Sequence, residues 1–157
     1  MRIGQGYDVH PLKAGRSLVL GGVHIDHPRG LDGHSDADVL THAVIDALLG
    51  ATGLGNIGEH FPVTDPHYKD IASLELLAAT AAEVQDAGHR VVNIDCTIVA
   101  EEPRLQPHLE EMRNNLADRL GIEHTMVSVK ATSPEGLGAL GRKEGIEAHA
   151  IVLIDAI

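Results

Sequence analysis

The sequence predicts an α/β (α+β) sandwich, in which a mixed β-sheet carries helices packed on one face. Two observations favour this fold class. In the second half of the chain, β-branched segments alternate with segments of helical periodicity, which is typical of helices that cover a sheet. The 157 residues contain neither an internal repeat nor a linker-like tract, so we expect a single domain over residues 1–157.

The beginning of the chain predicts strands joined by tight turns. Residues 2–10 alternate between apolar and polar positions, which is the period of a half-buried strand. Residues 18–25 predict a β-hairpin, because Gly21 and Gly22 at its centre supply the positive φ of a two-residue turn. Residues 26–34 combine glycines with a proline, and we expect them to form a loop.

A helix is expected over about residues 36–50, followed by a long loop. Ser35, with Asp38 three residues later, resembles a capping box, the hydrogen-bonded start of a helix. Residues 50–70 are rich in glycine, proline, histidine and aspartate. A connection of this length inside a compact domain is usually functional or mobile.

The second half of the chain predicts two helices and three strands. In order, these are a helix over 73–87, a strand over 91–100, a helix over 107–120, a strand over 126–131, a loop over 132–145 and a strand over 146–154. Ser73 and Pro107 are residue types that begin helices, whereas Gly88 and Gly121 are types that end them.

Charge and composition narrow the choice of partners. Asp and Glu number 23 against 12 Lys and Arg, a formal net charge of −11, so the long-range field repels nucleic acids and anionic membranes. The chain has 2 Tyr, 1 Phe and no Trp, too few aromatic rings for a protein that stacks bases. No apolar run approaches the roughly 20 residues of a membrane span, and the first residues carry no signal or transit pattern. The single Cys96, a core residue in mid-strand, excludes an internal disulfide and suits a reducing, cytoplasmic compartment.

The 11 histidines are many for this length and direct attention to metal binding. Asp8 and His10 are two residues apart on the first predicted strand, so both side chains leave the same face. A catalytic zinc takes three protein ligands, and His42 in the following helix is the third candidate. We expect Asp46, one turn later, to hold the outer nitrogen of His42. The alternative is an ordinary strand end and a half-buried helix histidine.

Two further segments carry groups that bind phosphate or a hard cation. His34 and Ser35 precede a helix whose free N–H groups favour an anion, although a simple N-cap is the alternative. Residues 130–135 bring a lysine, two hydroxyls and a glutamate to a strand end, and Arg142 follows. Hydroxyls can bind a phosphate group, and a carboxylate can bind Mg²⁺. The alternative for this segment is a solvated turn. The residues alone therefore indicate metal-dependent chemistry on a phosphorylated small molecule.

Six short segments carry a resemblance to a known family. In chain order they are Gly6–His10 (GYDVH), His34–Val39 (HSDADV), Gly53–Gly58 (GLGNIG), Phe61–Pro66 (FPVTDP), Lys130–Thr132 (KAT) and Gly141–Gly145 (GRKEG). Together they resemble the 2-C-methyl-D-erythritol 2,4-cyclodiphosphate synthases of the non-mevalonate isoprenoid pathway, over essentially the whole chain. The resemblance implies one catalytic domain, which forms a homotrimer with active sites between adjacent subunits.

The reaction that the resemblance implies is an intramolecular phosphoryl transfer, carried out by a divalent-metal-dependent phosphorus–oxygen lyase. The 2-phosphate of 4-diphosphocytidyl-2-C-methyl-D-erythritol 2-phosphate attacks the β-phosphorus of the cytidine diphosphate. The products are 2-C-methyl-D-erythritol 2,4-cyclodiphosphate and CMP. Because the nucleophile is already an anion, positioning and charge neutralisation supply the catalysis without a strong base.

The resemblance also assigns ligands to two metal ions. The family's zinc ligands match Asp8, His10 and His42, the trio that the spacing favours. The ligand of a second ion, Mg²⁺ or Mn²⁺ between the α- and β-phosphates, matches Glu135.

Catalytic and substrate positions follow from the same comparison. His34 and Ser133 match positions that stabilise the transition state, Ser133 replacing a common Thr. Thr132 and residues 100–106 fall where the family holds the CDP moiety. Positions implied to contact substrate are Ser35, Asn56, Ile57, Gly58, Phe61, Pro62, Val63, Thr64, Asp65, Ala100, Pro103, Arg104, Leu105, Gln106, Thr132, Glu135 and Arg142.

Three residues depart from the family's pattern. Asn56 stands where an Asp usually contacts the ribose hydroxyls, Val63 replaces an Asp of the substrate loop, and Ala139 replaces a larger apolar residue. These differences concern nucleotide affinity, not the reaction class. Two other classes stay open: a metal-dependent phosphohydrolase, which would release CMP with an uncyclised product, and a binding protein without turnover.

Overall fold

A computed structural model describes residues 1–157 and has the predicted layers. Five strands form one mixed sheet in the order β4-β1-β7-β5-β6, and β2 and β3 form a separate hairpin. The strands are β1 (Arg2–Ala14), β2 (Leu18–Leu20), β3 (Val23–Ile25), β4 (Arg29–Leu31), β5 (His89–Val99), β6 (Val127–Thr132) and β7 (Gly145–Ala156). The helices are α1 (Val39–Thr52), α2 (Ile57–His60), α3 (Ser73–Asp86), α4 (Leu109–Leu120) and α5 (Gly138–Gly141).

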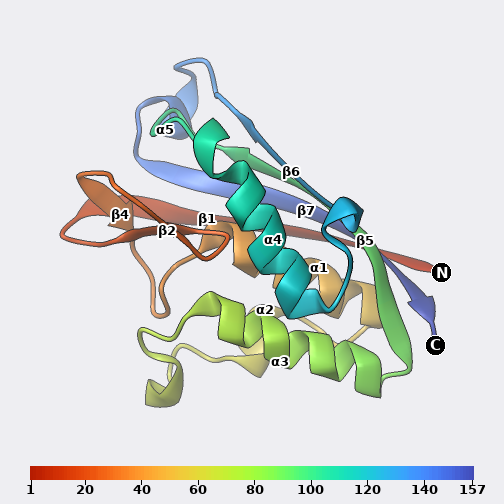
Figure 1. Cartoon of the computed structure of the whole chain (residues 1–157). Coiled ribbons are helices and arrows are strands. Elements are labelled where there is room, and N and C mark those ends of the chain that lie inside the picture. Colours follow the sequence, from red (N-terminus) through yellow and green to blue (C-terminus); the bar gives the residue numbers. More distant parts are fainter.

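The helices lie on one face of the sheet, as the sequence predicts (Figure 1). Helix α1 packs on β1 and β7, α4 packs on β6, and α3 packs against both helices. One face of the sheet is therefore buried and the other is exposed. In strand β7 the even-numbered residues from Ile146 to Ile154 are fully buried, whereas Ile151 is 54% exposed. The second face of the sheet is left without a covering layer. No helix is long and apolar enough to span a membrane.

The predicted strands are confirmed, with longer ends and one addition. Strand β1 continues beyond residue 10 to Ala14, and its last part pairs with β4 through Leu12 and Leu31. Strand β4 lies inside the expected loop over 26–34, so that part of the expectation was wrong. Three residues are too short to show a strand period, and the partner strand supplies the pairing.

The start of α1 differs from the expected capping box. The N-cap is Asp38, not Ser35, and its side chain accepts a hydrogen bond from the N–H of Thr41. The same buried carboxylate accepts the N–H groups of Gly21 and Gly22, so it joins the hairpin turn to the helix. Burial raises the pKa of Asp38 above its ordinary value.

Four smaller differences concern helix starts and loops. Ser73 is the first residue of α3 and does not cap it, since Asp36 accepts the N–H of Ser73 instead. Pro107 lies in a 3₁₀ turn, and α4 begins at Leu109. The long connection over 50–70 contains α2 and a 3₁₀ turn, and the expected loop over 132–145 contains α5.

Candidate metal centre and substrate cavity

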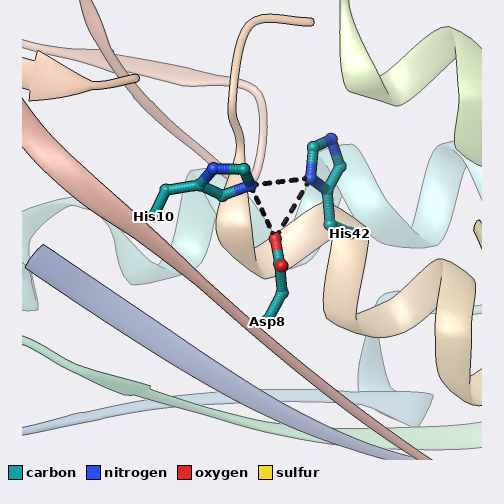
Figure 2. Close-up of side chains that lie close together, drawn as sticks. All are labelled: Asp8, His10 and His42. Carbon is teal, nitrogen blue, oxygen red and sulfur yellow. Dashed lines mark hydrogen bonds and ion pairs between the residues drawn. The ribbon is translucent and has the colours of Figure 1, made fainter. Parts of the chain in front are cut away.

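Asp8, His10 and His42 converge on one point between the sheet and α1. Asp8 and His10 come from the same face of β1, and His42 comes from α1 (Figure 2). Asp8 Oδ2 lies 2.9 Å from His10 Nε2 and 3.1 Å from His42 Nδ1, and the two nitrogens are 3.2 Å apart. The three candidate ligands of the sequence analysis are therefore brought together.

This donor set fits a tetrahedral metal ion such as zinc. Tetrahedral bonds of about 2.0–2.1 Å place neighbouring ligand atoms about 3.3 Å apart, close to the separations of this trio. One carboxylate and two imidazoles leave a fourth position for substrate, as catalytic zinc sites do. The second ring nitrogen of His10, Nδ1, lies 3.0 Å from the carbonyl oxygen of Asp32. A carbonyl only accepts, so Nδ1 carries the proton and Nε2 is free to bind a cation.

The electrostatics of the trio favour a charged Asp8. Burial raises the pKa of the Asp8 carboxyl, but its interactions with the His10 and His42 rings outweigh this effect and lower that pKa to about 2. For His10, burial lowers the pKa, yet the hydrogen bond to Asp8 leaves it raised. An anionic carboxylate at the centre of the trio is what a divalent cation requires.

The outer nitrogen of His42 has different partners from those expected. Nε2 lies 2.8 Å from Ser73 Oγ and 3.1 Å from Ser35 Oγ. The expectation for Asp46 was wrong: its Oδ1 accepts the backbone N–H of Ile57 at 2.7 Å, at the start of α2. Asp46 therefore holds the loop after α1, whereas hydroxyls orient His42.

A cavity of about 170 Å³ opens beside the trio. Its lining combines polar and apolar side chains, which suits a small ligand with an anionic group and a carbon skeleton. Besides the trio, its lining residues are His34, Ser35, Ile57, Gly58, Phe61, Val63, Tyr68 and Leu76. Six positions that the resemblance assigns to catalysis or substrate contact therefore share this cavity with the candidate metal ligands.

Four further predicted positions lie near the cavity without lining it. Asn56 caps α2, with its side-chain oxygen accepting the N–H of Glu59 and its amide contacting the Glu59 carboxylate. The carbonyl oxygen of Asp65 accepts from Nε2 of His34 at 3.0 Å and so fixes the ring. Pro62 and Thr64 belong to the same loop.

The second group of predicted residues lies at another corner of the sheet. Ser133 Oγ donates to the Glu101 carboxylate at 3.1 Å and accepts the N–H of Glu135 at 3.0 Å. The N–H of Ala100 donates to the carbonyl of Thr132, so residues 100–106 begin beside this turn. Ala100 and Leu105 are buried, and only their backbone groups are available to a ligand. Pro103, Arg104 and Gln106 complete this corner.

The sheet register separates this corner from the trio. Val9, between Asp8 and His10, pairs with Glu147, which pairs with Val99, which pairs with Thr132. Three strand spacings of about 4.8 Å give roughly 14 Å between Val9 and Thr132. Arg142 also lies away from the cavity, since it follows α5 and pairs with Glu144 at 2.6 Å. Within one chain the two groups therefore do not form a single pocket.

Four residues at or near the cavity are not predicted from the sequence. Tyr68 and Leu76 line the cavity, Ser73 contacts the outer nitrogen of His42, and Asp36 contacts Ser73. Ser73 stood out only as a helix-starting residue. Its contact with His42 spans 31 positions, which no local pattern reveals.

A five-stranded mixed sheet with helices on one face, and three candidate metal ligands beside a small cavity, are typical of α/β enzymes that bind a metal ion. The chain matches the YgbB family over residues 1–155 and belongs to that family.

Named relatives agree with this membership. A 2-C-methyl-D-erythritol 2,4-cyclodiphosphate synthase of Syntrophomonas wolfei is 63% identical over 99% of both chains. The bifunctional IspDF of Campylobacter jejuni is 41% identical with a TM-score of 0.96, and this chain spans 42% of that longer protein. The CDP complex of IspF from Plasmodium falciparum is 32% identical, covers 99% of this chain and 96% of its own, and has a TM-score of 0.87.

Proposed function

We propose that this protein is a 2-C-methyl-D-erythritol 2,4-cyclodiphosphate synthase, a CMP-releasing phosphorus–oxygen lyase of the cytoplasm. The observation that carries the proposal is the convergence of Asp8, His10 and His42 over the half-apolar cavity. The identity and coverage of the named relatives support the choice of substrate, 4-diphosphocytidyl-2-C-methyl-D-erythritol 2-phosphate. This substrate contains a CDP moiety, and CDP is the ligand named for a structural neighbour.

The reaction balances without any added reactant. An oxygen of the 2-phosphate forms a bond to the β-phosphorus, and the bond from that phosphorus to the bridging oxygen breaks. The bridging oxygen keeps the electron pair and leaves as part of CMP. Because the attacking oxygen is already charged, the protein has to place it in line with the leaving oxygen and offset negative charge.

Two sets of side chains would hold the metal ions. Asp8, His10 and His42 would bind Zn²⁺, and the Glu135 carboxylate would bind Mg²⁺ or Mn²⁺ at the diphosphate. When bound, such cations withdraw charge from phosphate oxygens and hold those oxygens in a fixed arrangement.

The remaining residues bind and orient the substrate. His34, whose ring is held by the Asp65 carbonyl, and Ser133 would donate hydrogen bonds to phosphate oxygens as charge shifts between them. The apolar lining residues Ile57, Phe61 and Leu76 would cover the methylerythritol carbons and exclude water. Exclusion of water matters because water would divert the reaction to hydrolysis.

A homotrimer would complete the site. The cavity and the corner around Thr132 are roughly 14 Å apart in one chain, so a substrate that spans both needs the corner of an adjacent subunit. The uncovered sheet face supports association, because it carries exposed apolar side chains. Their exposed fractions are 72% for Ile3, 45% for Tyr7, 46% for Val9 and 54% for Ile151. A closed ring of heterologous contacts would repeat the composite site three times.

Phosphorus-31 NMR with the proposed substrate and Mg²⁺ tests the function. We expect new resonances of a cyclic diphosphate together with CMP, in equal amounts. Release of CMP with an open bisphosphorylated product would make the protein a phosphohydrolase. Binding of substrate without any turnover would make it a binding protein, and either outcome would overturn the proposal.

A further inference from the structure

Ser73 links the metal ligand His42 to the carboxylate of Asp36. Its hydroxyl lies 2.8 Å from His42 Nε2, the ring nitrogen that faces away from Asp8. The same hydroxyl contacts Asp36 Oδ1, and the backbone N–H of Ser73 donates to Asp36 Oδ2 at 3.0 Å. Ser73 is 0% exposed, so bulk water does not replace these partners.

The direction of each hydrogen bond follows from what the groups can donate. An ionised carboxylate only accepts, so the single hydroxyl proton of Ser73 is donated to Asp36. Ser73 Oγ must then accept from Nε2–H of His42. A neutral imidazole carries one N–H, so His42 Nδ1 presents its lone pair toward Asp8 and His10. This is the tautomer that binds a cation at the trio.

Ser35 supplies the other hydroxyl near His42 Nε2, but this hydroxyl does not fix the direction of the hydrogen bond. Its Oγ accepts the N–H of Ala37 and lies 3.4 Å from Ser73 Oγ. No carboxylate accepts its proton, so that proton is free to rotate. The contact between Ser73 and Asp36 is therefore what distinguishes the two tautomers of His42.

We propose that Ser73, oriented by Asp36, is a positioning residue of the metal centre and holds His42 in the tautomer whose Nδ1 binds the cation. The inference rests on the zinc site of the proposed function. It assigns a role to two residues that touch neither the metal nor the substrate. Partners of this kind on the outer nitrogen of a metal-bound histidine typically change metal affinity by about 10–100-fold.

Zinc affinity tests the role, measured on protein stripped of metal by competition with a chromophoric chelator. Ser73→Ala is expected to bind zinc about 10–100-fold more weakly than wild type. Asp36→Asn should also bind more weakly. The double variant should bind no more weakly than Ser73→Ala alone, because Asp36 acts through Ser73.

Thr80 provides a matched control on the same helix. It is also 0% exposed, and its hydroxyl bonds only the carbonyl of Leu76. Thr80→Ala removes a buried hydroxyl from α3 without touching His42. We expect it to leave zinc affinity unchanged even where it lowers the stability of the fold.

The tautomer itself is a second readout that a merely structural role would not move. Long-range ¹H–¹⁵N spectra of the metal-free protein distinguish the two neutral forms of the His42 ring. Wild type should hold His42 with the proton on Nε2. Ser73→Ala should shift it toward the form protonated on Nδ1, which donates to Asp8.

Each outcome decides between the two proposals. Wild type that binds no zinc would overturn the metal centre itself. The positioning role alone would be overturned if wild type binds zinc, Ser73→Ala binds it with an affinity within about twofold of wild type, and the tautomer of His42 is unchanged. If Ser73→Ala does not fold, Asp36→Asn decides by the same two readouts, since it keeps both hydroxyls.

Discussion

Gly6 on β1 lies against Ala43 on α1 with no room for a side chain between them. A Cβ added to Gly6 would lie 1.9 Å from the carbonyl oxygen of Ala43, and one added to Gly4 would lie 1.8 Å from that of Ala47. Two residues of the strand thus span about the same length as four residues of the helix, because the rise per residue is about 3.3 Å in a strand and about 1.5 Å in a helix. The two backbones are therefore in direct contact over this length.

The close approach sets the geometry of the candidate metal centre. Asp8 and His10 are the next residues on the same face of β1, and His42 is the neighbour of Ala43. Because the strand lies directly on the helix, short side chains from each reach a common point. Any residue larger than glycine at position 6 has to push the strand away from α1.

Gly6→Ala is therefore expected to lower both stability and zinc affinity. Overpacking costs about 1–3 kcal/mol, and a clash with a backbone oxygen should reach at least that range. Gly50→Ala is the matched control, since nothing lies within 4 Å of a Cβ at this exposed position of α1. The control should gain about 0.5–1 kcal/mol from helix propensity. Urea unfolding checks both, and equal stabilities would contradict the packing argument.

His42→Ala is expected to lose zinc and activity together. The substitution removes one of three ligands and leaves Asp8 and His10 too few to retain the ion at submicromolar concentration. Metal content after dialysis and product formation are the two measurements. His24→Ala, at an exposed position of β3, is the control and should keep both. Full activity of His42→Ala would show that the trio is not the catalytic metal site.

Glu135→Gln is expected to weaken the dependence on Mg²⁺ or Mn²⁺ while zinc stays bound. The amide keeps the shape of the side chain but lacks the charge that a hard cation prefers. A titration of activity against Mg²⁺ should shift to higher concentration. Glu110→Gln, on the exposed surface of α4, should not shift. Superimposable titrations would exclude Glu135 as a ligand.

Cys96 should be inert in the folded protein and should make stability depend on alkaline pH. Burial raises the pKa of its thiol to about 12, while in the unfolded chain it stays near 8.5. A raised folded pKa contributes stability that is present below about pH 8.5 and is lost as pH rises toward 12. The free energy of unfolding of wild type, measured by denaturation at increasing pH, should therefore fall more steeply than that of Cys96→Ala. Parallel curves, or rapid thiol labelling without unfolding, would contradict this account.

The trio of Asp8, His10 and His42 can be predicted from the sequence because the periodicities of a strand and a helix place these side chains. Asp8 and His10 share a strand face by the period of two, and His42 stands on a helix that has to cover that face. Asp46 was placed wrongly because helical spacing gives only its distance from His42. Its carboxylate instead meets the N–H of Ile57, which the loop folds back onto it.

Long-range contacts account for what the sequence does not predict. Ser73 reaches His42, and Asp38 reaches the Gly21–Gly22 turn, only after the helices and the hairpin have packed. Strand β4 pairs through three residues and is defined by its partner. The resemblance names Ser133 and Glu135, but no pattern in the chain tells whether they act on the cavity of their own chain.

Mixing two inactive variants tests whether the active site spans two subunits. His42→Ala removes the zinc group and keeps the corner around Thr132, whereas Glu135→Ala does the reverse. If each site joins one group from each of two neighbours in a closed ring, random assembly from equal amounts restores about one quarter of the sites. We expect that fraction of wild-type activity after unfolding and refolding the two together. Separately refolded and then mixed trimers are the control and should stay inactive. No recovery despite subunit exchange, shown by mass spectrometry of tagged chains, would mean that one chain builds the whole site.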